Sequence, residues 1–246
     1  RPRSRQSGGY GRQERNEQLH RRAGELHLIL AVGTNTTDTQ PILSLRVKKA
    51  ILKGAKLIVV DPHKIELVGL THRWLPLNIS TDIPLFNAIA HVILEEDLHD
   101  KEYVAARTEG MEELRQFLKT YTPEYGESHT GLPREEIVAA AREYATAERA
   151  AVIYTLGVTE HVHGVYNVQA LANLTMLTGN LGIPSAGMNP LRGQNNVQGA
   201  GDMGALPAFL PGYQRHGDDE PRARFEKEWG VELDPKPGLT KVAAVE

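Results

Sequence analysis

Short apolar runs alternate with longer amphipathic segments along the chain from Glu25 onward. Three runs, at 26–32, 56–60 and 150–156, have the length and apolar content of strands buried in a parallel sheet. A further candidate strand lies at 72–78. This pattern predicts a sheet whose strands are separated along the sequence by helices.

Helical spacing of apolar residues occupies the segments between these runs. Between the first two strands, Pro41 suits the first turn of a helix and Gly54 suits its C-terminal cap. Thr81 or Asp82 can cap the next helix. Further helices are expected over the ranges 83–97, 101–109, 111–121, 133–147 and 167–179. Glycine and proline dominate the chain beyond residue 180, and no further helix or strand is predicted there.

A strand, a polar loop, a helix and a second strand within about 35 residues form a βαβ unit, whose crossover should be right-handed. The chain is therefore predicted to be an α/β protein with a Rossmann-like, doubly wound and mostly parallel sheet. We expect a disordered basic tail over 1–24, an α/β ligand-binding domain over 25–190, and a loop with part of a second α/β domain over 191–246. The last part is weakly patterned, so the fold is expected to be incomplete.

Composition narrows the class of protein. The chain of 246 residues is 40% hydrophobic and 24% charged, as in an ordinary soluble protein. It has no apolar run of about eighteen residues and no secretory signal pattern, so we expect no membrane span. It has no cysteine, which excludes disulfides, thiolate zinc sites and iron–sulfur clusters held by this chain. These features favour a cytoplasmic protein.

Charge is distributed unevenly along the chain. Residues 1–23 hold seven arginines against Glu14 and Glu17, a net charge of +5, and the total of −3 leaves −8 for the remainder. A basic arm could touch nucleic acid, but a polar end with few aromatic residues is more typical of disorder. Since the body of the chain is acidic, we expect no nucleic-acid partner.

The loops after the predicted strands hold the candidate ligand residues. Doubly wound sheets bind ligands at the carboxyl ends of their strands, which here means 33–39, 61–66 and 157–164. In the first loop, Gly33 allows a tight exit from the strand, and polar side chains beside a helix N-terminus suit phosphate. The alternative is a capped helix start. The fingerprint G-x-G-x-x-G is absent, which argues against an ordinary NAD site.

Two acidic residues and two histidines carry further hypotheses. Asp61, which ends the second strand, can accept hydrogen bonds from ribose hydroxyls or simply belong to a DP turn. Asp82 can face a guanine edge or cap its helix. His161 and His163 could begin a metal site, but no cluster of further ligands lies nearby in the sequence, so no metal site is predicted.

The segment NPLRGQNNVQGAGDMG, at 189–204, is rich in amides and glycines and holds one cation, Arg192. Side-chain amides present a donor beside an acceptor and match the edges of heterocycles such as guanine or pterin. The guanidinium suits a carboxylate or a phosphate, and glycine permits close backbone approach. The segment is predicted to be a ligand loop, with a polar turn cluster as the alternative.

Longer stretches resemble one family. The stretch NLTMLTGNLGIPSAGMNPLRGQNNVQGAGDMGALPAFLPGYQ closely resembles the catalytic subunit of molybdenum- or tungsten-dependent formate dehydrogenases, in the molybdopterin oxidoreductase superfamily. LAVGTNTTDTQP, GAKLIVVDPHKIEL and HVILEEDLHDKEYVAARTEGMEELR resemble the same subunit in the same order. The resemblance covers about residues 28–214, and 189–204 is its most specific part.

The resemblance implies a bis-molybdopterin guanine dinucleotide cofactor, with molybdenum or tungsten, bound between α/β domains. It implies oxidation of formate to CO2 by two electrons, with Arg192 as the catalytic arginine and Gln194 beside the metal-bearing end of the cofactor. Asp61 and Asp82 fall where the family binds ribose and guanine. The cofactor-binding residues predicted in the other two loops are Gly33, Asn35, Asp38, Thr39, Leu156, Gly157 and Glu160.

The sequence departs from the family pattern. Glu160, Ser80 and Gly201 stand where the family usually has Gln, Gly and Cys. The family's iron–sulfur segment, its Cys or selenocysteine metal ligand and its later cofactor-binding domain have no match here. We therefore expect a central fragment of the catalytic subunit, with electron-transfer subunits as further partners, and expect the isolated chain not to oxidise formate.

Three alternatives stay open. The chain could belong to another molybdopterin oxidoreductase with a different substrate, to a non-catalytic nucleotide-binding or assembly module, or to a truncated relic. Reduction of another oxo-substrate by a full-length homologue would favour the first, and guanine nucleotide affinity without metal would favour the second. The zero cysteine count is consistent with the third.

Overall fold

The computed structural model describes residues 23–194, 196–240 and 243–245. These residues divide into two compact units after Leu191, which we call the sheet unit and the C-terminal unit. The predicted tail lies outside the described residues up to Arg22, and its last two residues belong instead to the 3-10 helix η1 (Ala23–Glu25). An ion pair of 3.1 Å between Glu25 Oε2 and Arg149 Nη1 anchors this turn.

Five parallel strands form the sheet, in the order β3-β2-β1-β4-β5. This arrangement confirms the predicted α/β fold with a parallel sheet, and all four candidate strands are present. The sequence pattern does not predict the fifth strand, because its sequence GMNP contains glycine and proline, which are tolerated at a sheet edge but rarely inside. The strands are β1 (Leu28–Val32), β2 (Lys56–Val60), β3 (Arg73–Leu75), β4 (Ala150–Tyr154) and β5 (Gly187–Pro190).

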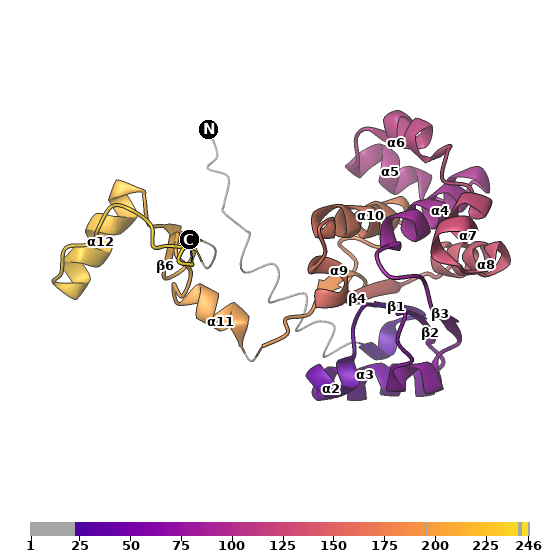
Figure 1. Ribbon diagram of the computed structural model, residues 1–246, viewed down its shortest axis with the longest axis horizontal. Helices are drawn as coiled ribbons and strands as arrows, with labels where there is room; N and C mark the ends of the chain where they lie inside the picture. The colour runs from indigo at the N-terminus through magenta and orange to yellow at the C-terminus, as the bar shows by residue number, and fades with distance from the viewer. Residues whose placement is uncertain (1–22, 195, 241–242, 246) are drawn as a thin grey trace. The chain divides into compact units, whose positions relative to one another are not determined.

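Helices cover both faces of the sheet, as Figure 1 shows with α3 on one side and α4, α8 and α10 on the other. Successive side chains of a strand point to opposite faces. Ile29 of β1 therefore packs in a cluster with Leu43 and Val47 of α3. Leu28 and Leu30 pack in the cluster on the other face, with side chains of α4, α8 and α10. The sheet is thus doubly wound.

The helix α7 is absent from the sequence prediction, because Gly126 interrupts its apolar pattern. Its boundary signals are nevertheless clear: the Thr122 hydroxyl accepts the Tyr125 N–H at 3.2 Å, and Gly131 ends the helix with a positive φ. Gly126 also permits close packing, since a Cβ there would lie 2.9 Å from Ala88 Cβ. The helices of the sheet unit after η1 are α2 (Thr36–Thr39), α3 (Pro41–Leu52), η2 (Glu66–Leu70), α4 (Asp82–Glu95), α5 (Lys101–Arg107), α6 (Met111–Leu118), α7 (Pro123–Thr130), α8 (Arg134–Ala145), α9 (Leu156–Thr159) and α10 (Gly164–Leu177).

The C-terminal unit holds elements that the sequence pattern does not predict. Its charged helix α12 has no buried residue, so no apolar stripe marks it, but Asp219 and Lys227 lie at the ends that the helix dipole favours. Its elements are α11 (Val197–Asp202), the antiparallel pair β6 (Phe209–Leu210) and β7 (Gln214–Arg215), and α12 (Asp219–Trp229). None of the helices in the described ranges combines the length and apolarity that crossing a bilayer requires.

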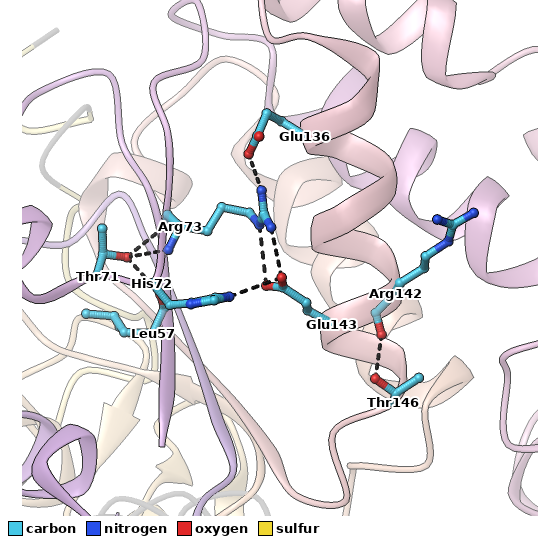
Figure 2. Close-up of polar contacts among 8 residues, drawn as sticks. All are labelled: Leu57, Thr71, His72, Arg73, Glu136, Arg142, Glu143 and Thr146. Carbon is cyan, nitrogen blue, oxygen red and sulfur yellow. Dashed lines mark hydrogen bonds and ion pairs between the residues drawn. The ribbon is translucent and has the colours of Figure 1, made fainter. Parts of the chain in front are cut away.

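A charge network fixes the edge strand β3 to α8 (Figure 2). Arg73 donates from Nη2 to Glu143 Oε1 at 2.8 Å and from Nε to Glu143 Oε2 at 3.3 Å, and it also pairs with Glu136. His72 Nε2 lies 3.1 Å from Glu143 Oε1. The Thr71 hydroxyl, just before the strand, reaches the Leu57 carbonyl at 2.7 Å. The edge of the sheet is therefore held by side chains as well as by the backbone ladder.

Two glycines bring the loops after β1 and β4 into direct backbone contact. A Cβ on Gly157 would lie 2.6 Å from Gly33 O, and a Cβ on Gly33 would lie 2.7 Å from the Gly157 carbonyl carbon. Gly33 also has a φ of +50°, which favours glycine. The Thr155 hydroxyl donates to Gly33 O at 2.7 Å and fixes the same contact. Any side chain at either glycine would force the two loops apart.

Replacing Glu143 with Gln should reduce the free energy of unfolding by about 2 kcal/mol, because charge-assisted hydrogen bonds from Arg73 and His72 are lost. Burial pushes the pKa of Glu143 upward, but hydrogen bonds from Arg73 and His72 outweigh burial and leave the pKa below its ordinary value. Because the pKa of Glu143 is lower in the folded protein than in the unfolded chain, its interactions stabilise the fold at pH values above the unfolded pKa of about 4.3. This stabilisation is lost as the pH falls through the folded pKa. Urea denaturation from pH 7 to pH 3 measures both effects.

Glu135, an exposed neighbour on α8, supplies the matched control. Its substitution by Gln should change stability by no more than about 0.5 kcal/mol. Equal losses for the two variants, or a loss for E143Q that persists unchanged at acidic pH, would contradict a role for the Arg73 network.

Replacing Gly157 with alanine should destabilise the sheet unit by about 1–3 kcal/mol, because the new methyl group meets backbone atoms of Gly33 that cannot rotate away. Gly69→Ala is the control, since a Cβ there has no neighbour within 4 Å. It should change stability by no more than about 0.5 kcal/mol. Chemical denaturation of both variants decides the matter, and similar midpoints for the two would show that the loop contact is unimportant.

Candidate functional site

The carboxyl ends of β1, β2, β3 and β4 lie along one edge of the sheet, because these strands are parallel. Chain order reverses at β1, which has β2 on one side and β4 on the other. Ligands of doubly wound folds bind at such a switch point. The loops that begin at Gly33 and Thr155 flank this point, and their mutual contact holds them there.

The loop after β1 is folded upon itself through its own polar groups. Asn35 Nδ2 donates to Asp38 Oδ2 at 2.6 Å, and the Thr39 hydroxyl donates to Asn35 O at 2.9 Å. The helix α2 in this loop is only four residues long and has no side-chain cap. The alternative expected from the sequence, a capped helix start, is therefore not what these side chains form.

Three buried oxygen atoms in this loop have no hydrogen-bond partner among the described residues: Thr34 Oγ1, Asn35 Oδ1 and Thr36 Oγ1. Thr34 is 2% exposed and Thr36 is 0% exposed. Leaving a buried polar atom unpaired costs about 1–3 kcal/mol. Three such atoms within three consecutive residues indicate a segment whose polar groups are completed by something other than the described chain.

Asp61 is half-buried and Asp82 is buried at the same edge. Burial raises the pKa of Asp61. The His63 N–H, which donates to Asp61 Oδ1 at 2.8 Å, lowers it but does not outweigh burial. Burial also raises the pKa of Asp82; its own backbone N–H and the charge of His161 oppose this, and the charge of Asp61 adds to it. The structure thus brings the two aspartates within electrostatic reach of each other. The Trp74 indole N–H fixes the Asp61 turn by donating to Asp61 O at 2.9 Å.

The loop after β4 contains Leu156, Gly157 and Glu160, all of them exposed. It forms the short helix α9 and then turns at His161, whose Nε2 lies 2.8 Å from Gly157 O. His161 Nδ1 lies 3.4 Å from Ser80 Oγ in the turn between β3 and α4.

Thr81, one of the two predicted caps of α4, occupies the N-cap position of that helix. Its hydroxyl does not cap the helix, because it donates instead to Asn78 O at 2.6 Å. Asp82 is the first residue of the helix rather than its cap. The carboxyl group of Asp82 therefore lies beside the free N–H groups of the first turn.

His161 and His163 lie between α9 and α10. No group of three or more His, Asp or Glu suited to a metal ion occurs within 23–194, 196–240 and 243–245. The ring of His163 instead faces Tyr166, with 6.3 Å between their centroids.

The amide-rich segment belongs partly to the C-terminal unit, where two of its amides have local partners. Asn196 has a φ of +49°, and its Oδ1 accepts the Gly199 N–H at 3.2 Å as the cap of α11. Gln198 Nε2 donates to Asp202 Oδ1 at 3.2 Å and to the Tyr213 hydroxyl at 3.3 Å. The segment is thus in part a helix and its cap, although its composition predicts a loop throughout.

Gly201 lies inside α11 and explains part of this packing. A Cβ at this position would lie 2.6 Å from the Tyr213 hydroxyl. The absence of a side chain therefore allows the tyrosine to reach Gln198. Arg192 and Gln194 precede α11 and are exposed, and Asn195 lies outside the described residues.

Sequence reasoning counts Thr36 among the polar donors of the loop after β1, but it misses Thr34 and the link between His161 and Ser80. Thr34 carries a usable signal, since it lies in the polar loop that follows a buried strand. The histidine link joins residues that are 81 positions apart, so no local pattern could reveal it.

Comparison with known proteins agrees with this geometry. The family model for molybdopterin oxidoreductase matches residues 10–245. Formate dehydrogenase H of Escherichia coli (strain K12) is 50% identical over 208 residues, which is 85% of this chain and 29% of that protein. The F420-dependent formate dehydrogenase subunit alpha of Methanocaldococcus jannaschii is 47% identical over 212 residues, which is 86% of this chain and 31% of that protein. The chain thus spans less than a third of the length of these relatives.

A solved structure shares the fold. Acetylene hydratase from Pelobacter acetylenicus aligns with a TM-score of 0.62 and 25% sequence identity, over 69% of this chain and 26% of that one. The family match over nearly the whole chain, the high identity to relatives and the parallel sheet with its polar carboxyl edge agree with one another. The chain belongs to the molybdopterin oxidoreductase family.

Proposed function

We propose that this chain is the nucleotide-binding core of a formate dehydrogenase catalytic subunit and serves the two-electron oxidation of formate to CO2. The observation that carries the proposal is the set of unpaired buried oxygens beside the switch point of the sheet. That set occurs in a chain 50% identical over 208 residues to a protein named Formate dehydrogenase H.

Family membership implies a molybdopterin cofactor that carries molybdenum or tungsten. The finer proposal is the bis-molybdopterin guanine dinucleotide form. Its fit to the loop after β1 is supported by Thr34 Oγ1 and Thr36 Oγ1, which are buried hydroxyls able to donate to an anion. Asn35, Asp38 and Thr39 would line the same loop, and Gly33 would let the backbone come close to a pyrophosphate.

The two aspartates of the edge suit the donor groups of a guanine nucleotide. Guanine presents N–H donors on one edge and ribose presents hydroxyls, and both need acceptors. Asp82 is 7% exposed, so little water reaches its carboxyl group, and a ligand that binds there takes the place of that water. We assign Asp82 to the base and Asp61 to the ribose. Burial raises the pKa of both aspartates, which fits this assignment. A carboxyl group that has lost its water is stabilised most by new hydrogen bonds from neutral N–H and O–H donors.

The loop after β4 would line the cofactor from the other side of the switch point, through Leu156, Gly157 and Glu160. Leu156 is 41% exposed, so its side chain is accessible for contact with a ring system. Glu160 is exposed, so water screens its charge from an anionic cofactor.

Arg192 and Gln194 are proposed for the reacting end. The bound cofactor supplies the two-electron chemistry, which no amino-acid side chain provides. A guanidinium can hold both oxygens of formate and so point the C–H bond in one direction. Gln194 would hydrogen-bond beside it through its amide. This chain contains no cysteine, so it supplies no thiolate to the metal.

Partners beyond formate are suggested by the names of relatives. Three of these are called subunit alpha of F420-dependent formate dehydrogenases, and such a name implies further subunits. We propose electron-transfer subunits and an iron–sulfur segment as partners of the complete enzyme, which would act in the cytoplasm.

A different substrate is the second candidate. Its support is the shared fold with acetylene hydratase, whose name specifies another small molecule. Identity favours formate, since that structure is 25% identical and the named formate dehydrogenases reach 50%.

In the complete enzyme, Arg192→Ala should lower kcat/KM for formate about 100-fold or more, because orientation and charge stabilisation are lost together. Pterin and metal content should stay at the wild-type level. Arg192→Lys should recover only part of the activity, since an ammonium cannot bind both oxygens in parallel. Formate-dependent dye reduction and cofactor analysis measure both quantities.

Arg215→Ala is the matched control, because Arg215 is another exposed arginine of the same unit. Its activity should stay near the wild-type value. A parallel loss of pterin and activity in Arg192→Ala would make Arg192 a structural residue. Unchanged kcat/KM for formate with altered turnover of another substrate would favour the second candidate.

A further inference from the structure

Two segments of the carboxyl edge meet at one side chain, His161. Its ring lies between Gly157 of the loop after β4 and Ser80 of the turn before α4. Its charge also acts on the carboxyl group of Asp82. A single imidazole therefore connects two loops and one of the two aspartates of the edge.

The partners of the ring decide where its proton lies. Gly157 O can only accept a hydrogen bond, so His161 Nε2, at 2.8 Å, must donate to it. In the neutral ring, Nδ1 is then the acceptor, and Ser80 Oγ donates to it across 3.4 Å. The neutral imidazole is therefore oriented by a carbonyl on one side and a hydroxyl on the other.

Ser80 occupies a backbone conformation that disfavours a side chain. Its φ is +66°, in the left-handed region where glycine is the ordinary choice. Keeping a side chain in this conformation costs free energy, which contacts with the surrounding structure must offset. The hydrogen bond to His161 is the contact that the structure provides.

His161 also acts on Asp82, whose pKa is raised mainly by burial and lowered by its own backbone N–H and by the charge of His161. Of the described residues, the charged groups that act on this carboxyl are His161, across the loop contact, and Asp61, directly after β2. His63 acts in turn on Asp61. The charge of His161 lowers the pKa of Asp82, whereas the charge of Asp61 raises it. The ring that joins the two loops therefore also favours the ionised form of Asp82, which burial and Asp61 oppose.

From this geometry we infer that His161 is a positioning residue that joins the turn before α4 to the loop after β4 and keeps the Asp82 carboxylate ready for a guanine nucleotide. The inference rests on the proposed nucleotide site but assigns a role that the site residues themselves do not fill. His161 does so without touching the nucleotide: one ring nitrogen holds the Gly157 carbonyl, the other holds Ser80, and the charge acts on Asp82.

The test compares His161→Phe, His161→Gln and His163→Gln in the full chain. Phenylalanine removes both hydrogen bonds and the charge. Glutamine keeps an N–H donor that can reach Gly157 O but carries no charge. His163, two residues away, contacts Tyr166 and is the control. The first readout is titration of the Asp82 side-chain carboxyl by 13C NMR without ligand, and the second is GDP affinity by calorimetry across a range of pH.

In both His161 variants, the midpoint of the Asp82 titration should move to higher pH, because a favourable cation has been removed. GDP affinity near neutral pH should fall about three- to tenfold in His161→Phe, the usual effect of losing one or two hydrogen bonds. His161→Gln should keep most of the wild-type affinity near neutral pH. When the pH is lowered, this variant should release GDP at a higher pH than the wild type does. His163→Gln should match the wild type in both readouts.

An Asp82 midpoint that is the same in the wild type and His161→Gln would overturn the inference, as would an equal shift in His163→Gln. If His161→Phe does not fold, the comparison of the two glutamine variants still decides. A wild-type chain that does not bind GDP would overturn the proposed nucleotide site instead, and the carboxyl titration would then decide the role of His161 alone.

Discussion

The backbone contact between Gly33 and Gly157 is the constraint on which the carboxyl edge depends. It places the loops after β1 and β4 against each other where the strand order reverses, and the Thr155 hydroxyl reinforces it. The candidate residues of the sheet unit lie in these two loops or beside them at the same edge. Because both positions exclude a Cβ, the contact is a property of the sequence and not only of packing.

Polar groups of the sheet unit differ in whether the described residues supply their hydrogen-bond partners. Thr34 and Thr36 bury hydroxyls that nothing in the described residues satisfies, whereas the charges of the Arg73 network find their partners within the chain. The first arrangement is typical of a binding site and the second of a structural anchor. The β3 edge, held by the Arg73 network, is thus the stabilising part of the sheet. The switch point, with its unpaired hydroxyls, is the candidate functional part.

Much of the fold was predictable from local pattern. Strands such as β1 and β2 are continuous apolar runs, and burial on both faces explains why. β5 escaped prediction because a glycine and a proline stand at its ends, and α12 because it buries no residue. The candidate site was also predictable only in part. The rule for doubly wound sheets indicated Asp61 and the loop after β1, but no local sequence pattern predicts a long-range contact such as that of His161. Composition also assigned Asn196 and Gln198 to a ligand, while both have partners within the C-terminal unit.

The central claim is that loops distant in sequence form one nucleotide-binding edge. Hydrogen–deuterium exchange of the chain with and without saturating GDP tests it most directly. We predict slower exchange with GDP in three segments together, 33–39, 61–65 and 156–163, and unchanged exchange in α6, which lies outside that edge. Protection confined to the C-terminal unit, or to only one of the three loops, would contradict a shared site at the switch point.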